Sequence, residues 1–131
     1  MAEHPHAALV RRGYEAFVSG DMDAMAGLLA ADVTHHVPGG NPLSGDHKGR
    51  DAVLDLYRRL GEETGGTMRA ELQRVLVDGR GHAVSVHRWT ATRKGRALDS
   101  TAVLVFRILG DRITDIDECV EDMDVEDAFW S

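Results

Sequence analysis

The spacing of the apolar residues changes near Gly65-Gly66, and this change constrains the fold more than any other feature of the chain. Before that point, apolar side chains recur every three or four residues, which is the period of a helix with one buried face. After it they alternate, which is the period of a strand with one buried face. A chain that is helical in its first half and extended in its second is expected to form an α+β domain, in which a curved antiparallel sheet wraps around the helices.

Three helices are expected in the first half. The first follows Pro5 and ends at Ser19-Gly20, and the second covers residues 21–31. The third contains the apolar stripe of residues 53–60 and ends near the two glycines at 65 and 66. Residues 33–37 are expected to be extended before a Pro- and Gly-rich stretch interrupts regular structure.

Four strands are expected in the second half, at residues 68–77, 82–93, 96–109 and 112–122. The alternation reverses phase within the first of them, which predicts a β-bulge near Gln73 or Arg74. Lys94-Gly95 is typical of a two-residue hairpin loop. The short acidic end of the chain carries Phe129-Trp130, which we expect to hold it against the body of the protein.

The charge distribution excludes one class of partner. The chain has 131 residues and a net charge of −7, and its length suits a single domain over residues 1–131. Residues 110–131 contain nine acidic residues and one basic residue, so the remainder is nearly neutral. Since nucleic acids and anionic membranes are bound by clustered basic side chains, neither is expected as a partner.

The expected location is the cytoplasm. No apolar run is long enough to span a bilayer, and the first residues lack the apolar centre of a signal peptide. Cys119 is the single cysteine, so no internal disulfide is expected. Because no phosphate-binding loop or dinucleotide glycine pattern occurs, no cofactor is expected.

Pairing the strands places three residues in one row. A two-residue loop at 94–95 sets His87 opposite Ala102, and a three-residue loop in the last hairpin sets Ala102 opposite Glu118. An imidazole beside a carboxylate in an apolar concavity predicts a general acid/base pair. The result depends on register, because a slip of one residue would turn Glu118 outward and Asp117 inward. Together with His35 these residues lack a metal-ligand spacing, so no metal is expected.

Other residues are expected to line the same pocket. Only one of His35 and His36 can point inward, and parity with the pocket favours His35, which leaves His36 toward the helices or the rim. Tyr14 is either a packed core residue or a hydrogen-bond donor to the pocket. The expected wall consists of Trp89, Ser100, Leu104 and Val120, with Leu104 opposite Ile116.

Three segments carry a resemblance to a known family: SGDMDAMAGLLAADVTHHVPGG, PLSGDHKGRDAVLDLY and LVFRILGDRITDIDECVEDMD. They resemble the SnoaL-like branch of the nuclear-transport-factor-2-like superfamily, which includes ketosteroid isomerase. The resemblance covers nearly the whole chain. It implies a conical α+β barrel, a pocket between sheet and helices, and a homodimer formed through the outer face of the sheet.

The resemblance also bears on the pocket residues. It places His35, His87, Trp89 and Glu118 in the pocket, in agreement with the strand pairing. Ketosteroid isomerase works with an Asp base and with an oxyanion hole of a Tyr and a protonated Asp.

The positions that match these three groups in the present chain are Val37 for the base, Leu104 for the acid of the hole and Gly13 for the tyrosine, with Tyr14 one place away. The chain therefore departs from that mechanism at each position.

Two functions remain open. The first is a cofactor-independent isomerase, cyclase or dehydratase acting on a small, largely apolar metabolite, in which His87 and Glu118 move a proton next to a carbonyl and His35 orients the substrate or assists. The second is a noncatalytic dimeric protein that binds a ligand in the same pocket. A sequestered acid and base favour the enzyme, because an apolar ligand needs neither.

Overall fold

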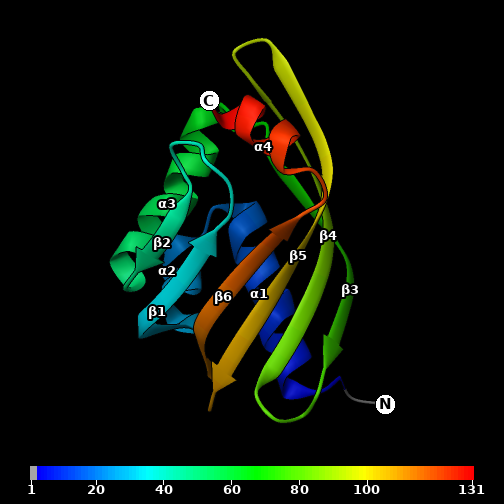
Figure 1. The fold of residues 1–131 in the computed structure, drawn as a ribbon. Coiled ribbons are helices and arrows are strands. Elements are labelled where there is room, and N and C mark those ends of the chain that lie inside the picture. The colour runs from blue at the N-terminus through cyan, green and yellow to red at the C-terminus, as the bar shows by residue number, and fades with distance from the viewer. Residues whose placement is uncertain (1–2) are drawn as a thin grey trace.

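The computed structural model describes residues 3–131, which form four helices and six strands (Figure 1). The helices are α1 (Pro5–Ser19), α2 (Met22–Leu28), α3 (Arg50–Glu63) and α4 (Met123–Trp130). The strands are β1 (Leu29–Val37), β2 (Gly45–Lys48), β3 (Arg69–Val77), β4 (His82–Arg93), β5 (Arg96–Leu109) and β6 (Arg112–Val120). The expected α+β class is confirmed.

The strands form one curved sheet in the order β2-β1-β6-β5-β4-β3, with α1, α2 and α3 on one of its faces (Figure 1). The sheet is open and mixed, since β1 runs parallel to β6 while every other pair of neighbours is antiparallel. The last hairpin leaves one edge of β6 unpaired, and β1 supplies the missing backbone hydrogen-bond partners there. The expected sheet of four antiparallel strands was therefore incomplete, because it did not include β1 and β2.

Helix ends follow local chemistry. Pro5 occupies the first turn of α1, where no backbone N–H is needed, and Gly20 ends it in the left-handed conformation with φ 72°. Asp21 accepts a hydrogen bond from the Ala24 N–H and caps α2. The second helix is shorter than expected because the chain turns into β1 at Leu29, whose side chain is fully buried.

The middle of the sheet has the expected register. His87 lies opposite Ala102 and Arg93 opposite Arg96, as a two-residue loop requires. The β3–β4 pairing shifts between Leu72 and Arg74, which confirms the predicted bulge.

The register of the last hairpin differs from the expected one. The loop has two residues rather than three, and Thr114 is an extra residue on β6 that places Arg107 opposite Asp115. Glu118 consequently lies opposite Leu104, and Val120 lies opposite Ala102. The error amounts to two residues, which is the side-chain period of a strand, so Glu118 keeps its expected face.

The bulge also changes the direction of one side chain. Ile113 is 2% exposed and belongs to the core with Ile116. Because the bulged residue breaks the alternation, both isoleucines point toward the helices.

The acidic end of the chain forms α4, a helix that the sequence reasoning did not foresee. Asp122 accepts a hydrogen bond from the Val125 N–H and begins the helix. Phe129 and Trp130 are buried, which confirms that they hold this segment in place. Arg93 donates to the Phe129 and Ser131 carbonyl oxygens and ties the end of the chain to β4.

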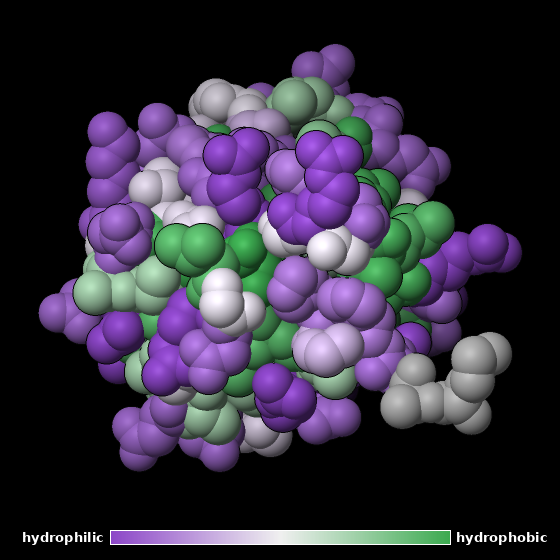
Figure 2. Space-filling view, turned by 90° about the horizontal axis from the view of Figure 1, so that it is seen from below, coloured by the Kyte–Doolittle hydropathy of each residue, from purple (hydrophilic) through white to green (hydrophobic). Residues whose placement is uncertain are grey.

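Within residues 3–131, none of the helices combines the length and the apolar composition that crossing a membrane requires. Seen from the end where β5 turns into β6, the surface shows apolar side chains among polar ones (Figure 2). Leu109, beside the β5–β6 turn, and Leu76, close to the β3–β4 turn, are exposed large apolar residues.

Candidate functional site

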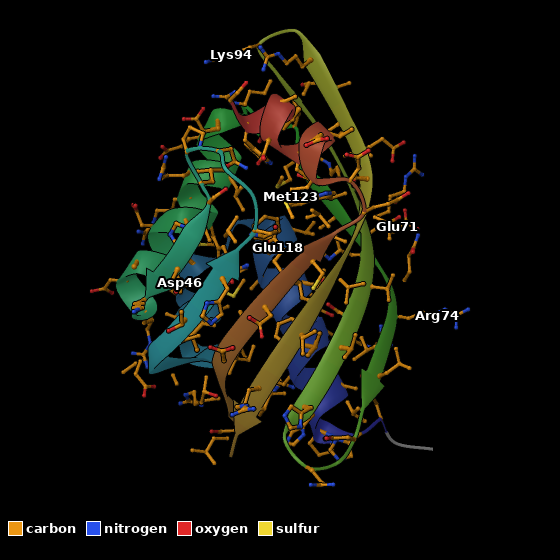
Figure 3. All side chains as sticks on the ribbon, viewed as in Figure 1. Asp46, Glu71, Arg74, Lys94, Glu118 and Met123 are labelled. Carbon is orange, nitrogen blue, oxygen red and sulfur yellow. The ribbon has the colours of Figure 1, made fainter. Side chains whose placement is uncertain are left out.

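A cavity lies between α1, α3 and the inner face of the sheet, and we call it the inner cavity. Its volume, measured as the space that the centre of a water-sized sphere can occupy, is about 80 Å³. Its walls are mostly apolar, and its polar exceptions are Tyr14, His35, Tyr57, His87 and Glu118. Figure 3 shows Glu118 inside the molecule, whereas Arg74 points away from the sheet.

Glu118 is held by a two-step hydrogen-bond chain. Its Oε1 lies 3.0 Å from His35 Nε2, and His35 Nδ1 lies 2.8 Å from the Tyr57 hydroxyl oxygen. Burial raises the pKa of Tyr57, with a further contribution from the Glu118 charge, so the hydroxyl keeps its proton. Tyr57 therefore donates to Nδ1, and Nε2–H donates to the carboxylate, because the opposite tautomer would set a lone pair against a carboxylate oxygen.

This arrangement leaves one oxygen of the Glu118 carboxylate available. The side chain of Glu118 is 11% exposed, and its Oε2 accepts no hydrogen bond within residues 3–131. A carboxylate fixed through one oxygen and free at the other, in an apolar cavity, can accept a proton from a bound molecule.

A second chain of hydrogen bonds orients His87. The Tyr14 hydroxyl oxygen lies 2.7 Å from Ser85 Oγ and 2.5 Å from His87 Nδ1. Ser85 is fully buried, and Tyr14 is the hydrogen-bond partner of its hydroxyl within the described residues. Because the buried Ser85 proton needs an acceptor, Ser85 donates to the Tyr14 oxygen. Tyr14 then donates its own proton to Nδ1, and the proton of the neutral imidazole resides on Nε2.

His87 Nε2 is buried and has no hydrogen-bond partner within residues 3–131. Burial lowers the pKa of His87, although the Glu118 charge acts in the opposite direction. Burial also raises the pKa of Tyr14 and keeps its hydroxyl protonated. His87 therefore carries a neutral N–H donor without a partner within residues 3–131, and leaving a buried donor unsatisfied costs free energy.

The structure brings together most of the expected site. His35, His87 and Glu118 all line the inner cavity, and so do Tyr14, Trp89 and Leu104. The expected row of His87, Ala102 and Glu118 was wrong, since Glu118 lies opposite Leu104. The carboxylate instead meets His35, because β1 lies beside β6.

Two expected wall residues lie elsewhere. Val120 lines a smaller neighbouring cavity together with Glu126 and Trp130. Ser100 is buried but lines neither cavity, and its hydroxyl faces the Thr101 carbonyl oxygen at 3.4 Å. The two-residue shift of β6 and the packing of α4 over this end of the sheet account for both placements.

The sequence reasoning gave no role to three polar residues. Tyr57 was assigned to an apolar stripe, yet a buried tyrosine hydroxyl requires a partner, and that requirement was the available signal. Ser85 alternates with His87 on β4, so strand parity was enough to find it. Glu126 is buried in α4, where it accepts hydrogen bonds from the indole N–H groups of Trp89 at 3.0 Å and Trp130 at 3.3 Å.

His36 lies on the outer face of the sheet, so its expected orientation toward the helices or the rim was wrong. Its Nδ1 lies 2.7 Å from Asp46 and its Nε2 lies 2.9 Å from Asp115, and these hydrogen bonds raise the pKa of His36. His36, Asp115 and Asp117 together have metal-ligand atoms that all lie within 4.8 Å of one another. Because all three side chains are partly or largely exposed to solvent, their closeness alone does not indicate a bound ion. The absence of a metal stays a prediction.

The fold and this cavity lead to a known family. The sequence profile of the SnoaL-like domain matches residues 10–116. The chain belongs to the SnoaL-like family. An uncharacterized protein of Mycobacterium tuberculosis is 32% identical to this SnoaL-like chain over 131 residues, which cover 100% of both proteins.

Solved structures agree with the assignment. Bal32a, from a soil-derived mobile gene cassette, is 41% identical with a TM-score of 0.95, and the match covers 97% of each chain. An NTF2-like protein from Burkholderia xenovorans, 20% identical with a TM-score of 0.84, covers 100% of this chain and 99% of its own. The latter similarity shows the fold alone, so the function has to be argued from the cavity.

Proposed function

We propose that this SnoaL-like chain is a cofactor-independent enzyme that transfers a proton next to a carbonyl group of a small, largely apolar molecule. One observation carries the proposal. Glu118, whose Oε2 accepts no hydrogen bond, and His87, whose Nε2 has no partner, both line the same apolar cavity within residues 3–131. A ligand that only needed apolar contact would require neither group.

The two groups have complementary roles. Glu118 removes a proton from the carbon next to the carbonyl, and the electron pair of that C–H bond moves onto the carbonyl oxygen as an enolate. His87 Nε2–H donates a hydrogen bond to this oxygen and stabilises the developing negative charge. His35 keeps the carboxylate in place through its own Nε2–H.

The fate of the enolate decides the reaction type. Return of the proton from Glu118 to another carbon gives isomerisation. Attack of the enolate carbon on a second carbonyl, whose oxygen takes the proton from Glu118, gives cyclisation. Departure of a hydroxyl from the carbon next to the enolate, as water that carries the proton from Glu118, gives dehydration. All three reactions share the first step and are supported equally by the cavity. The base and donor are side chains, so the proposal includes no cofactor or metal.

We also propose that the protein is a homodimer formed through the outer face of the sheet. Val84, Val86, Val103 and Val105 lie on that face in two cross-strand pairs and are half-buried in the single chain. Contact with a second copy would remove these valines from water. The molar mass in solution, measured by light scattering, tests this, and a monomeric mass would contradict it. The cytoplasmic location stays a prediction.

The test of the enzymatic proposal uses proton exchange, which needs no knowledge of the natural substrate. Cyclohexanone and 2-tetralone are incubated with the protein in D2O, and deuterium uptake next to the carbonyl is followed by NMR. We expect the wild-type protein to accelerate the exchange, and we expect Glu118→Gln to lower this acceleration by about 10²- to 10⁴-fold, which is the usual contribution of a general base.

The matched control is Asp115→Asn, which neutralises an acid of the same strand on the opposite face and is expected to leave exchange unchanged. His87→Gln is expected to slow exchange while ligand binding persists. If both ketones bind, as shown by a change in tryptophan fluorescence, but the wild-type protein does not accelerate exchange, the chain is a noncatalytic binding protein and the proposal fails.

A further inference from the structure

The inner cavity is too small to be the whole binding site. Its volume of about 80 Å³ lies below the range of roughly 300–1,000 Å³ that is usual for small-molecule sites. Beside it lies a larger hollow of about 510 Å³, measured in the same way, which we call the outer basin. The outer basin lies between the turn that joins α1 to α2 and the turn that joins α3 to β3.

Phe17 and Tyr57 line both spaces and form the wall between them. Their rings meet edge to face, with centroids 5.8 Å apart and an interplanar angle of 89°. Tyr57 is buried and held by His35, whereas Phe17 is half-buried at the end of α1. A rotation of the Phe17 side chain would therefore join the inner cavity to the outer basin while leaving the hydrogen bond between Tyr57 and His35 intact.

The outer basin differs chemically from the inner cavity because it contains two arginines. Arg58 comes from α3 and Arg69 from the start of β3. One terminal nitrogen of Arg69 donates to the carbonyl oxygens of Gly66 at 3.0 Å and Met68 at 2.8 Å, which holds the guanidinium at the rim. Glu62 also lines the basin, but within residues 3–131 neither arginine has a carboxylate within 4.0 Å.

We propose that the outer basin binds the carboxylate end of an amphipathic substrate whose apolar, carbonyl-bearing end enters the inner cavity. Guanidinium groups recognise carboxylates through paired N–H donors, and both arginines have donors to spare. A local pair of positive charges is needed for this purpose, because a chain of net charge −7 otherwise repels an anion. The inference rests on the proposed function only for the carbonyl in the inner cavity.

The test compares two probes of equal chain length, decanoate and 1-decanol, whose binding is followed by the fluorescence of the tryptophans. Trp89 lines the inner cavity and reports on its occupation. We expect the double variant Arg58→Gln/Arg69→Gln to weaken decanoate binding by about fivefold to tenfold, a modest change because the basin is open to solvent, and 1-decanol binding by less than about twofold.

Arg59→Gln is the matched control, since it removes the same charge from the neighbouring position of α3 without touching the basin. It should leave both probes unaffected. Phe17→Trp should slow the association of both probes, because it enlarges the side chain between the two spaces.

Unchanged decanoate affinity in the double variant, or an equal loss for 1-decanol, would overturn the inference. Unchanged association rates in Phe17→Trp would show that ligands reach the inner cavity by another route, which would overturn it too. Neither outcome depends on catalysis, because Glu118→Gln is expected to bind both probes even if proton exchange is lost or was never present.

Discussion

Two adjacent histidines of β1 meet carboxylates of β6 on opposite faces of the sheet. His35 points inward and its Nε2 lies 3.0 Å from Glu118, while His36 points outward and its Nε2 lies 2.9 Å from Asp115. The two distances are nearly equal, yet the surroundings differ. The side chain of His35 is 4% exposed, and that of His36 is 35% exposed.

The difference teaches that the environment of a histidine–carboxylate pair decides its role. On the inner face, Tyr57 occupies Nδ1 of His35, so the pair is an oriented network with one free carboxylate oxygen. On the outer face, Asp46 occupies Nδ1 of His36, and water competes for every partner. The inner pair can act on a bound molecule, and the outer pair is a solvated ionic cluster.

The largest expected effect is the loss of stability on replacing His35, compared with the loss on replacing His36. His35→Ala leaves the Tyr57 hydroxyl and the Glu118 carboxylate without their partner in the interior, and should lower the free energy of unfolding by about 3–5 kcal/mol. His36→Ala removes an exposed pair and should lower it by about 1 kcal/mol or less. Urea denaturation measures both values, and equal losses would remove the distinction between the faces.

A smaller effect is expected from the groups that hold each Nδ1. Tyr57→Phe deprives His35 Nδ1 of its donor in the core and should cost about 1–3 kcal/mol of the free energy of unfolding. Asp46→Asn removes the corresponding partner of His36, and its urea midpoint at neutral pH should stay close to that of the wild-type protein. If the order were reversed, the inner network would not be the better satisfied of the two.

The smallest effect concerns pH. The Asp46 and Asp115 carboxylates raise the pKa of His36 above 6.5, whereas burial lowers the pKa of His87 below it. The stability that His36 contributes is complete below pH 6.5 and is lost as the pH rises through its folded-state pKa. His87 acts in the opposite sense, because the unfolded chain gains its proton near pH 6.5 and stability falls as the pH drops toward the folded-state value.

Proton NMR of the imidazole C2–H signals between pH 4 and 9 measures both titrations. His36→Gln should lose its destabilising effect as the pH rises above 6.5, with a difference of about 1 kcal/mol or less at lower pH. His87→Gln should flatten the fall in stability below pH 6.5. A His36 titration below 6.5 would contradict the assignment of the outer cluster.

Local patterns were sufficient for much of the fold. The period of the apolar residues located α1 and α3, and the change of phase in β3 located its bulge, because these features depend on the nearest neighbours in the chain. The boundary between α2 and β1 was less accessible, since burial of Leu29 rather than helix propensity decides where the strand begins.

The site was predicted in part. The prediction that Glu118 points inward was correct although the predicted register was wrong, because the register error equalled one full side-chain period of two residues. The row with His87 was wrong, because the two-residue loop and the bulge at Thr114 together shift β6 by two residues and set Glu118 opposite Leu104. Ser100 and Val120 were placed with the inner cavity, but Val120 lines the neighbouring cavity with Glu126 and Trp130 of α4, and Ser100 lines neither.

The sequence by itself separated the two faces of β4 and β5, because alternation along a strand without a bulge is a property of two or three neighbouring residues. It therefore separated His35 from His36 and placed His87 opposite Ala102. Only the tertiary structure decided that β1 runs parallel to β6 and brings His35 to Glu118, 83 residues away. Such a pairing depends on which sheet edge remains free once the whole chain is packed, and no local pattern records that.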